Sequence, residues 1–278
     1  MSELDPFRAV DQQPDPHRYV ALLEQRGASN SYLRLVRQFL ALIKIRPGWK
    51  VLEIGCGTGV VARLLAERVG HTGRATGIDP SAVLIREARR LARANGLGRR
   101  VRFDVGDGNA LHCRGGTFDA SVAVTVVLHV PTPDQLLREM VRVTRPGGVI
   151  GVLDQDFGSL VLDHPDRRLT QKILNAYARR IYRDPWSGRT MFGTFKRLGL
   201  DRVRVATGVL QDSTCEPMTR AFLERRVETV YQWNIISRQE RNQWLQSLEN
   251  QARTGTFFMT LNFYGVVGVK PVAPSGRS

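Results

Sequence analysis

The sequence has few cysteines, no long apolar run and a shortage of acidic residues. Its 3 cysteines, Cys56, Cys113 and Cys215, are widely separated, which excludes a disulfide scaffold and a cysteine-based zinc site. No apolar run approaches the roughly 20 residues that a membrane-spanning helix needs, and the N-terminal segment lacks the apolar core of a signal peptide. We therefore expect a cytoplasmic protein without a membrane span.

The shortage of acidic residues leaves a large positive charge. Lys and Arg together number 41 against 26 Asp and Glu, so the formal net charge is +15. A surplus of this size raises the question of a nucleic-acid partner. Hydrophobic residues make up 42% of the chain, which is enough for a packed core and argues against disorder.

The order of the expected elements is that of an α/β protein. After a polar, proline-containing segment that predicts turns or an extended arm, residues 19–45 show helical apolar spacing with a break near 27–30. Strands are then expected at 51–54, 75–78, 101–105, 118–124 and 149–153, separated by helices at 60–69, 81–95 and 132–143. Apolar strands that alternate with helices predict a doubly wound, mostly parallel sheet.

The pattern changes after residue 154. Helical segments are expected within 158–199 and at 216–234 and 237–253, and further strands at 203–210 and 257–270. The two added strands would complete a seven-stranded sheet. The extra helices lie outside the alternation, so we expect them to form a helical lid over the carboxyl ends of the strands, where open α/β sheets bind ligands.

A glycine-rich turn follows the first expected strand, in the sequence VLEIGCGTG. Gly55, Gly57 and Gly59 allow the backbone to turn tightly and to approach a ligand closely. The spacing differs from the dinucleotide fingerprint G-x-G-x-x-G, because Val60 stands where the third glycine would fall. The carboxylate of Glu53, just before the turn, suits a ligand with a cationic group better than a pyrophosphate.

Two further carboxylates stand at the ends of expected strands. Asp79, in GIDPS, ends the second strand, where a carboxylate can accept hydrogen bonds from both hydroxyls of a ribose. Asp107, in GDGNA, follows the third strand and suits an adenine amine. A lone loop carboxylate is usually only solvated, but three in order at strand ends predict a ligand that contains a nucleoside and a cation.

These segments resemble the motifs of a known family. VLEIGCGTG, GIDPS, GDGNAL, FDASVAVTVVLHV and RVTRPGG look like a class I S-adenosylmethionine-dependent methyltransferase of the ubiquinone/menaquinone-biosynthesis type, which includes many small-molecule enzymes. The likeness is clear over about residues 50–155. It implies a Rossmann-like fold, methyl transfer, and S-adenosyl-L-methionine as cofactor with S-adenosyl-L-homocysteine as product, and it says little about the substrate.

The resemblance also implies the cofactor residues. It places the glycine turn beside the methionine part, Asp79 on the ribose, Asp107 on the adenine amine and the backbone of Val124 near the amino group. The implied cofactor-binding residues are Glu53, Gly55, Gly57, Gly59, Asp79, Pro80, Asp107, Gly108, Asn109 and Val124. On this basis we expect an N-terminal arm with helices (residues 1–48), a cofactor-binding core (49–157) and the rest of the fold (158–278), with lid insertions at about 158–190 and 213–254.

The candidate catalytic residues follow the fourth and fifth strands. Methyl transfer from a sulfonium mainly needs alignment, and a general base helps only when the acceptor must lose a proton. His129 is a candidate base or substrate contact, or it orients its loop; Asp154 and Asp156 are candidate bases, ligands for a cationic substrate, or caps. The candidate substrate contacts, which are otherwise ordinary loop or helix-face residues, are His164, Tyr177, Arg189 and Tyr231. No metal-ligand spacing is present, so we expect no metal.

Three functions remain open. The leading one is methyl transfer to an O, N or C atom of a small, apolar or aromatic metabolite. Aromatic residues in the expected lid either line a pocket for such a metabolite or form the core of the lid itself. An RNA methyltransferase would explain the charge, but the Asn/Asp-Pro-Pro-aromatic motif of amine-directed enzymes is absent at 123–127, so we do not expect nucleic acid. A protein that binds the cofactor for another purpose, as a cyclase or a partner-activating module, is the third. A homodimer is one option for its assembly, and the basic cluster between Arg86 and Arg102 has no assigned role.

Overall fold

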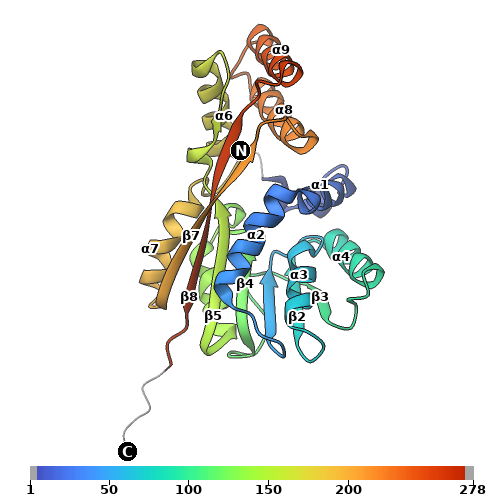
Figure 1. The fold of residues 1–278 in the computed structure, drawn as a ribbon, viewed down its shortest axis with the longest axis vertical. Helices are drawn as coiled ribbons and strands as arrows, with labels where there is room; N and C mark the ends of the chain where they lie inside the picture. The colour runs from blue at the N-terminus through green and yellow to red at the C-terminus, as the bar shows by residue number, and fades with distance from the viewer. Residues whose placement is uncertain (1–4, 273–278) are drawn as a thin grey trace, which may run out of the picture.

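The structure is a computed structural model that describes residues 5–272, and one twisted sheet lies at its centre (Figure 1). The strand order is β3-β2-β1-β4-β5-β8, and β7 and the two-residue β6 also pair with β8. The strands are β1 (Lys50–Ile54), β2 (Arg74–Asp79), β3 (Val101–Val105), β4 (Phe118–Val124), β5 (Thr144–Gln155), β6 (Val161–Leu162), β7 (Asp201–Asp212) and β8 (Met259–Val269). Strands β1 to β5 pair in parallel, whereas β8 runs antiparallel to each of its neighbours.

Helices cover both faces of this sheet, as expected of a doubly wound fold. The helices and short 3-10 turns are η1 (Pro6–Arg8), η2 (Val10–Gln12), α1 (His17–Ala28), α2 (Asn30–Ile43), α3 (Val60–Arg68), α4 (Ala82–Ala94), η3 (Val127–His129), α5 (Pro133–Val143), η4 (Phe157–Ser159), α6 (Arg167–Ile181), α7 (Ser187–Arg197), α8 (Pro217–Gln232) and α9 (Arg238–Thr254). Apolar side chains of α2, α3 and α4 join one core cluster, and those of α5 and α7 join another with the opposite face.

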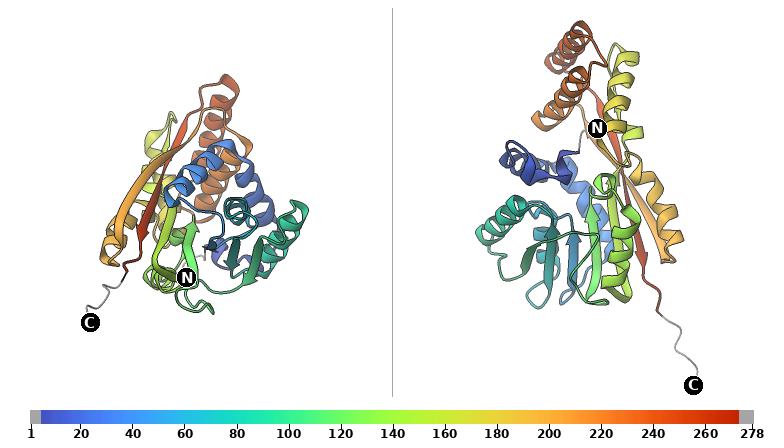
Figure 2. Two further views of the ribbon diagram at one scale, coloured as in Figure 1. Left: turned by 60° about the horizontal axis from the view of Figure 1, so that its bottom comes forward. Right: turned by 180° about the vertical axis from the view of Figure 1, so that it is seen from behind.

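The lid is carried by a two-stranded ribbon. β7 and β8 pair over their whole length, from Asp201 opposite Val269 to Asp212 opposite Met259. Only the second half of β8 also pairs with β5, so the other half projects beyond the sheet, and α6, α8 and α9 gather around its far end (Figures 1 and 2). The expected lid helices therefore lie past the carboxyl ends of the parallel strands.

Residues 5–28, which contain η1, η2 and α1 and are called the N-terminal segment, lie between the sheet and the lid (Figure 2). The expected break in the first helix is confirmed at Ser29, which separates α1 from α2. Asp11 of η2 accepts hydrogen bonds from the Ser81 hydroxyl and from the amides of Ala82 and Val83, which begin α4. These contacts satisfy free amides at a helix N-terminus and hold the segment in place.

The predicted α/β class with a mostly parallel sheet is confirmed, with three differences in detail. The short strand β6 adds an eighth strand to the seven expected. β5 begins at Thr144 rather than at 149, because the chain becomes extended as soon as α5 ends. The region 158–199 contains η4 and β6 before its two helices. The proposed division into three parts remains a prediction. Within residues 5–272, no helix is long and apolar enough to cross a bilayer.

Candidate active site

The glycine turn between β1 and α3 adopts a conformation that suits glycine. Gly55, Gly57 and Gly59 have φ angles of 66°, 52° and 79°, a region that side chains with a Cβ rarely occupy. A Cβ on Gly55 would also lie 2.5 Å from the side chain of Val126, and one on Gly59 would lie 2.6 Å from the ring of Phe103. The three glycines therefore allow the turn to pack against the neighbouring loop and strand.

Asp79 connects the first two loops of the site. One carboxylate oxygen accepts a hydrogen bond from the amide of Gly57 at 2.9 Å, and the other accepts one from the amide of Ser81 at 2.9 Å. The side chain is nearly buried, and burial raises the pKa of its carboxyl despite these two amide donors. Asp79 thus holds the glycine turn against the start of α4.

The third loop is built by a carboxylate and an amide side chain. Asp107 accepts hydrogen bonds from the backbone amide of Asn109 at 2.8 Å and from its side-chain amide at 3.0 Å. The side-chain oxygen of Asn109 in turn accepts from the hydroxyl of Thr132, 3.0 Å away. These hydrogen bonds fix the shape of the loop, and Asp107 is exposed.

The loops enclose a cavity of about 430 Å³ at the carboxyl ends of the strands. Most of the predicted cofactor residues line it together, namely Gly55, Gly57, Asp79, Pro80, Asp107, Gly108 and Asn109. Glu53 and Val124 line a smaller adjoining cavity beneath the glycine turn, where Gly55 and Gly57 also lie. Gly59 lines neither cavity and acts on the shape of the turn.

Two buried groups without partners mark the smaller cavity. One carboxylate oxygen of Glu53 is inaccessible and has no hydrogen-bond partner, and burial raises the pKa of this carboxyl well above its ordinary value. The Nε atom of Arg26 is likewise buried without a partner and lines the same cavity. Arg26 as a whole is partly exposed and its guanidinium lies over the ring of Tyr32. The free carboxylate oxygen and the free guanidinium N–H can serve the ammonium and carboxylate groups of an amino acid. This part of the site therefore fits the methionine end of S-adenosylmethionine.

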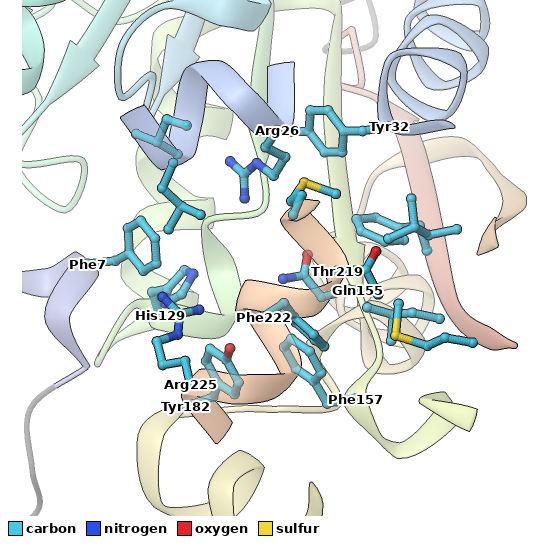
Figure 3. A pocket seen from close by; sticks show the side chains of 17 residues that line it. Phe7, Arg26, Tyr32, His129, Gln155, Phe157, Tyr182, Thr219, Phe222 and Arg225 are labelled. Atoms are coloured by element: carbon cyan, nitrogen blue, oxygen red, sulfur yellow. The ribbon is translucent and has the colours of Figure 1, made fainter. Parts of the chain in front are cut away.

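A further cavity of about 100 Å³, the lid cavity, lies under the lid. It borders the cavity of about 430 Å³, which we call the cofactor cavity. Phe7, Leu23, Arg26 and His129 line both cavities. Figure 3 shows the lid cavity, with rings of Phe157, Tyr182 and Phe222 among its labelled side chains. An apolar cavity that opens on the cofactor site is the place for a second reactant.

His129 stands at the border of the two cavities, at the end of η3. Its Nδ1 atom pairs with the carboxylate of Asp5, which is almost completely buried. The ring also lies against Phe7 and Tyr182, with centroid separations of 5.2 Å and 5.5 Å. These contacts fix the orientation of the imidazole.

Asp154 and Asp156 do not line either cavity. Asp154 is fully buried and accepts hydrogen bonds from the amide of Leu128 and the hydroxyl of Ser187, both at 2.9 Å. Burial raises the pKa of its carboxyl to about 6. Asp156 accepts from the amide of Gly158 and pairs with the guanidinium of Arg189. These positions favour a role in holding loops over a role as base.

The four candidate substrate contacts lie away from both cavities. His164 stacks on Trp244 of α9, with ring centroids 4.9 Å apart, and burial lowers the pKa of its imidazole. Tyr177 is buried in the lid core, and Tyr231 packs against the same core. Arg189 is occupied by Asp156. The structure therefore does not bring these residues together, and it gives each of them a packing or pairing role.

Comparison with known proteins identifies the family. Residues 51–148 match a family described as a methyltransferase domain. An uncharacterised 37.1 kDa protein in transposon Tn4556 of Streptomyces fradiae is 30% identical over 260 residues, which cover 91% of this chain and 71% of that protein. Methyltransferase GfsG of Streptomyces halstedii is 36% identical over 121 residues, or 44% of this chain and 43% of its own length.

The chain belongs to the class I S-adenosylmethionine-dependent methyltransferases. Its cofactor is S-adenosyl-L-methionine, as predicted. A solved structure, that of the [4+2]-cyclase SpnF, shares the fold with a TM-score of 0.57 at 21% identity, over 89% of this chain and 85% of that one. The match covers less than half of the length of GfsG.

Several residues that line the methyltransferase site carry no signal in the sequence. Phe7 and Arg26 come from the N-terminal segment, Gln155 ends β5, and Tyr182 and Arg225 come from the lid. No local motif marks them, because the tertiary fold alone brings these segments together, and none was predicted. Among the described residues, no group of three or more His, Cys, Asp or Glu side chains could hold a metal ion.

The basic cluster is partly explained by local pairing on α4 and β3. The guanidinium of Arg89 donates to the carbonyl of Phe103, and Arg90 pairs with Glu87 of the same helix. Arg102 pairs with Asp104 on β3. Neither the cofactor cavity nor the lid cavity is lined by these arginines.

Proposed function

We propose that this methyltransferase transfers the methyl group of S-adenosylmethionine to a hydroxyl oxygen of a small, largely apolar metabolite held under the lid. The observation that carries the proposal is the position of His129, which lines both cavities and is fixed by a buried carboxylate. The bound cofactor supplies an activated methyl group on its sulfonium. A neutral hydroxyl is a weak nucleophile, so its methylation gains from a base at the junction of the two cavities.

Cofactor binding is assigned to residues of the sheet loops and of α1. We assign Asp79 to the ribose and Asp107 to the adenine amine, and both line the larger cavity at the ends of successive strands. Glu53 and Arg26 would complement the charged groups of the methionine end, since each has a buried atom without a partner there. A charged partner satisfies such an atom and removes the cost of its burial.

His129 is assigned as the general base. Its Nδ1 pairs with Asp5, which holds the proton on that nitrogen and leaves Nε2 to accept the proton of the substrate hydroxyl. Asp5 is a positioning residue in this scheme. Asp154 is another, because it holds the amide of Leu128, the residue that precedes His129 in η3.

The lid and the N-terminal segment would exclude water from the reaction. Phe7 packs against His129 at the border of the two cavities, and Phe157 stacks on Tyr182 with ring centroids 4.4 Å apart on the lid side. Exclusion of water keeps the acceptor and the methyl donor in contact and prevents wasteful reactions. Asp156 supports this wall, because it accepts the amide hydrogen bond that begins η4, the turn that contains Phe157.

Methyl transfer can be tested with a mixture of candidate acceptors. The protein is incubated with methyl-labelled S-adenosylmethionine and a fractionated metabolite extract, and labelled products are identified by mass spectrometry. We expect label on an oxygen of a small apolar product, and His129→Gln should reduce it by about 100-fold or more while cofactor affinity stays within about twofold. Label on nucleic acid would favour the RNA alternative, and cofactor binding without label transfer to any fraction would favour a cyclase or a partner-activating module.

The assembly remains a separate prediction. A homodimer is proposed on the sequence alone, and it is tested by light scattering coupled to size-exclusion chromatography. A monomeric mass over the whole concentration range would overturn it.

A further inference from the structure

The charges that line the lid cavity are all of one sign. Arg26 and Arg225 line it, and no Asp or Glu among the described residues does so. The remaining side chains of the lining are apolar, apart from those of Tyr32, His129, Gln155, Tyr182 and Thr219. A cavity with positive charges and low-polarity walls attracts negatively charged ligands.

Arg225 contributes a charge that the cofactor cavity lacks, and it also lines a surface groove that contains Glu224, Glu228 and Glu249. It extends from α8 into the space shown in Figure 3, and it does not line the cofactor cavity. Its Nε atom is inaccessible to solvent without a hydrogen-bond partner, and no described residue forms an ion pair with its guanidinium. Arg225 is only partly exposed, and its buried Nε atom lacks an acceptor, which is costly for a charged group. The arrangement fits a ligand that provides the missing acceptor.

Neighbouring arginines of the lid show what Arg225 lacks. Arg220, five residues earlier on α8, pairs with Glu249 of α9, and Arg241 pairs with Glu228. Both salt bridges lie outside the cavity that Arg225 lines. These two arginines are thus paired with carboxylates, whereas Arg225 forms no ion pair with a described residue.

A second cation lies directly behind the cavity wall. Arg226 is 1% exposed and is surrounded by rings, with its guanidinium carbon 3.2 Å from the centroid of Phe222 and 4.5 Å from that of Tyr177. It donates hydrogen bonds to the hydroxyl of Tyr182 at 3.0 Å and to the carbonyl of Phe222 at 2.9 Å. No described carboxylate pairs with it, so its charge adds to the positive potential of the cavity.

A hydrogen-bond acceptor is also left free in this cavity. The side-chain oxygen of Gln155 is buried without a partner, and the residue is 8% exposed. A substrate with a hydroxyl group can donate to this oxygen. The cavity therefore presents an anion-binding group and an acceptor within an otherwise apolar wall.

We propose that the substrate is a hydroxylated carboxylic acid with an apolar or aromatic body, and that Arg225 binds its carboxylate. Arg26 is committed to the methionine end of the cofactor, so Arg225 is the guanidinium that remains for the substrate. Arg225 can form a bidentate pair with a carboxylate, which selects for this group by geometry as well as by charge. The assignment rests on the proposed function for the identity of this cavity as the acceptor site, but it makes its own prediction about binding.

The test measures binding rather than turnover. Hydroxybenzoic acids and hydroxylated medium-chain fatty acids are titrated by calorimetry into the protein saturated with S-adenosylhomocysteine, and each acid is compared with its primary amide. We expect at least one acid to bind about tenfold or more tightly than its amide, because a charge-assisted pair is lost in the amide. Arg225→Gln should weaken binding of that acid by about tenfold and leave the amide unchanged, and Arg225→Lys should retain the preference for the acid.

Arg220→Gln is the matched control, since it removes a positive charge from the same helix outside the cavity. Its acid affinity should equal that of the wild type, and thermal unfolding checks that each variant is folded. Equal binding of acids and amides, unchanged acid binding by folded Arg225→Gln, or no binding of any acid at millimolar concentration would each overturn the proposal. Preferential binding of an acid that is never methylated would contradict the proposed function and leave this assignment intact.

Discussion

The carboxylate of Asp5 pairs with Nδ1 of His129, although 124 positions separate the two residues in the sequence. The pair joins the N-terminal segment to the loop after β4. It also lies between the cofactor cavity and the lid cavity, because His129 lines both. The N-terminal segment therefore both borders the site and orients the proposed base.

Asp5→Asn should lower turnover more than binding. The amide can still bond to the imidazole, but it no longer stabilises the positive charge that the ring gains with the substrate proton. We expect kcat to fall by about 10- to 100-fold, with KM for the cofactor within about twofold. Steady-state kinetics checks this, with the exposed Asp15→Asn as control. If His129 and Asp5 act as one unit, Asp5→Asn should cost little more in a His129→Gln background, and additive losses would argue against the pairing as the source of the effect.

Asp79→Ala should weaken cofactor binding. The variant loses the proposed acceptor for the ribose, and it loses the link between Gly57 and Ser81. We expect the affinity for S-adenosylmethionine to fall by about 10- to 100-fold in calorimetry, as for the loss of a hydrogen-bonded charged group. Asp119→Ala is the control, because Asp119 also holds neighbouring segments, through the amide of Lys50 and the side chain of Arg145, but lines neither cavity. Equal losses in both variants would show that the effect is structural.

Asp11→Ala should loosen the N-terminal segment. The variant removes the carboxylate that accepts from Ser81, Ala82 and Val83 at the start of α4. We expect a loss of about 1 kcal/mol in the free energy of unfolding, as for a lost N-cap. Cofactor affinity should fall as well, because Phe7 and Arg8 of this segment line the cofactor cavity. Urea unfolding and calorimetry measure the two effects. Asp134→Ala, in the first turn of α5, is the control and should leave cofactor affinity unchanged.

Asp154 should make stability depend on pH. Burial raises the pKa of its carboxyl from 3.8 to about 6 in the folded state. A carboxyl with a raised pKa stabilises the fold at low pH and loses this contribution as the pH rises through the folded-state pKa. Between about pH 4 and pH 7 its ionisation should therefore reduce the free energy of unfolding by about 3 kcal/mol.

Asp154→Asn cannot ionise and should lack this part of the pH dependence. Relative to the wild type, the variant should gain stability as the pH rises, as measured by urea unfolding at successive pH values. Asp134→Asn, at an exposed position, should run parallel to the wild type. Parallel curves for Asp154→Asn and the wild type would contradict the raised pKa. Turnover of Asp154→Asn should fall through misplacement of His129, with cofactor affinity nearly unchanged.

The cofactor half of the site could be predicted from the sequence, and the substrate half could not. Glu53, Asp79 and Asp107 each stand next to a strand whose apolar pattern is visible, and parallel strands bring their carboxyl ends to one edge. The parallel pairing of these strands then brings the residues that follow them to one site. Predictions that depend on one strand and its following loop therefore locate the residues within the fold.

The lid cavity depends on contacts between distant segments. Phe7, Gln155 and Arg225 come from three such segments, and no spacing in the sequence relates them. Aromatic residues in the lid do not by themselves locate the cavity. Tyr177 and Tyr231 pack within the lid core, whereas Phe222 lines the cavity. One helix can present aromatic rings to a core and to a ligand on adjacent faces, and the sequence alone does not distinguish the two.

The ribbon of β7 and β8 has a consequence for how this enzyme can evolve. The residues proposed to bind the cofactor are anchored in the parallel strands and the loops that follow them, whereas α8 is held by a ribbon that projects past the sheet. Mutations that reshape α8 can therefore accumulate without disturbing the strands that carry Glu53 and Asp79. Such a division permits new acceptor molecules to be adopted by changes in the lid, while the methyl donor stays the same.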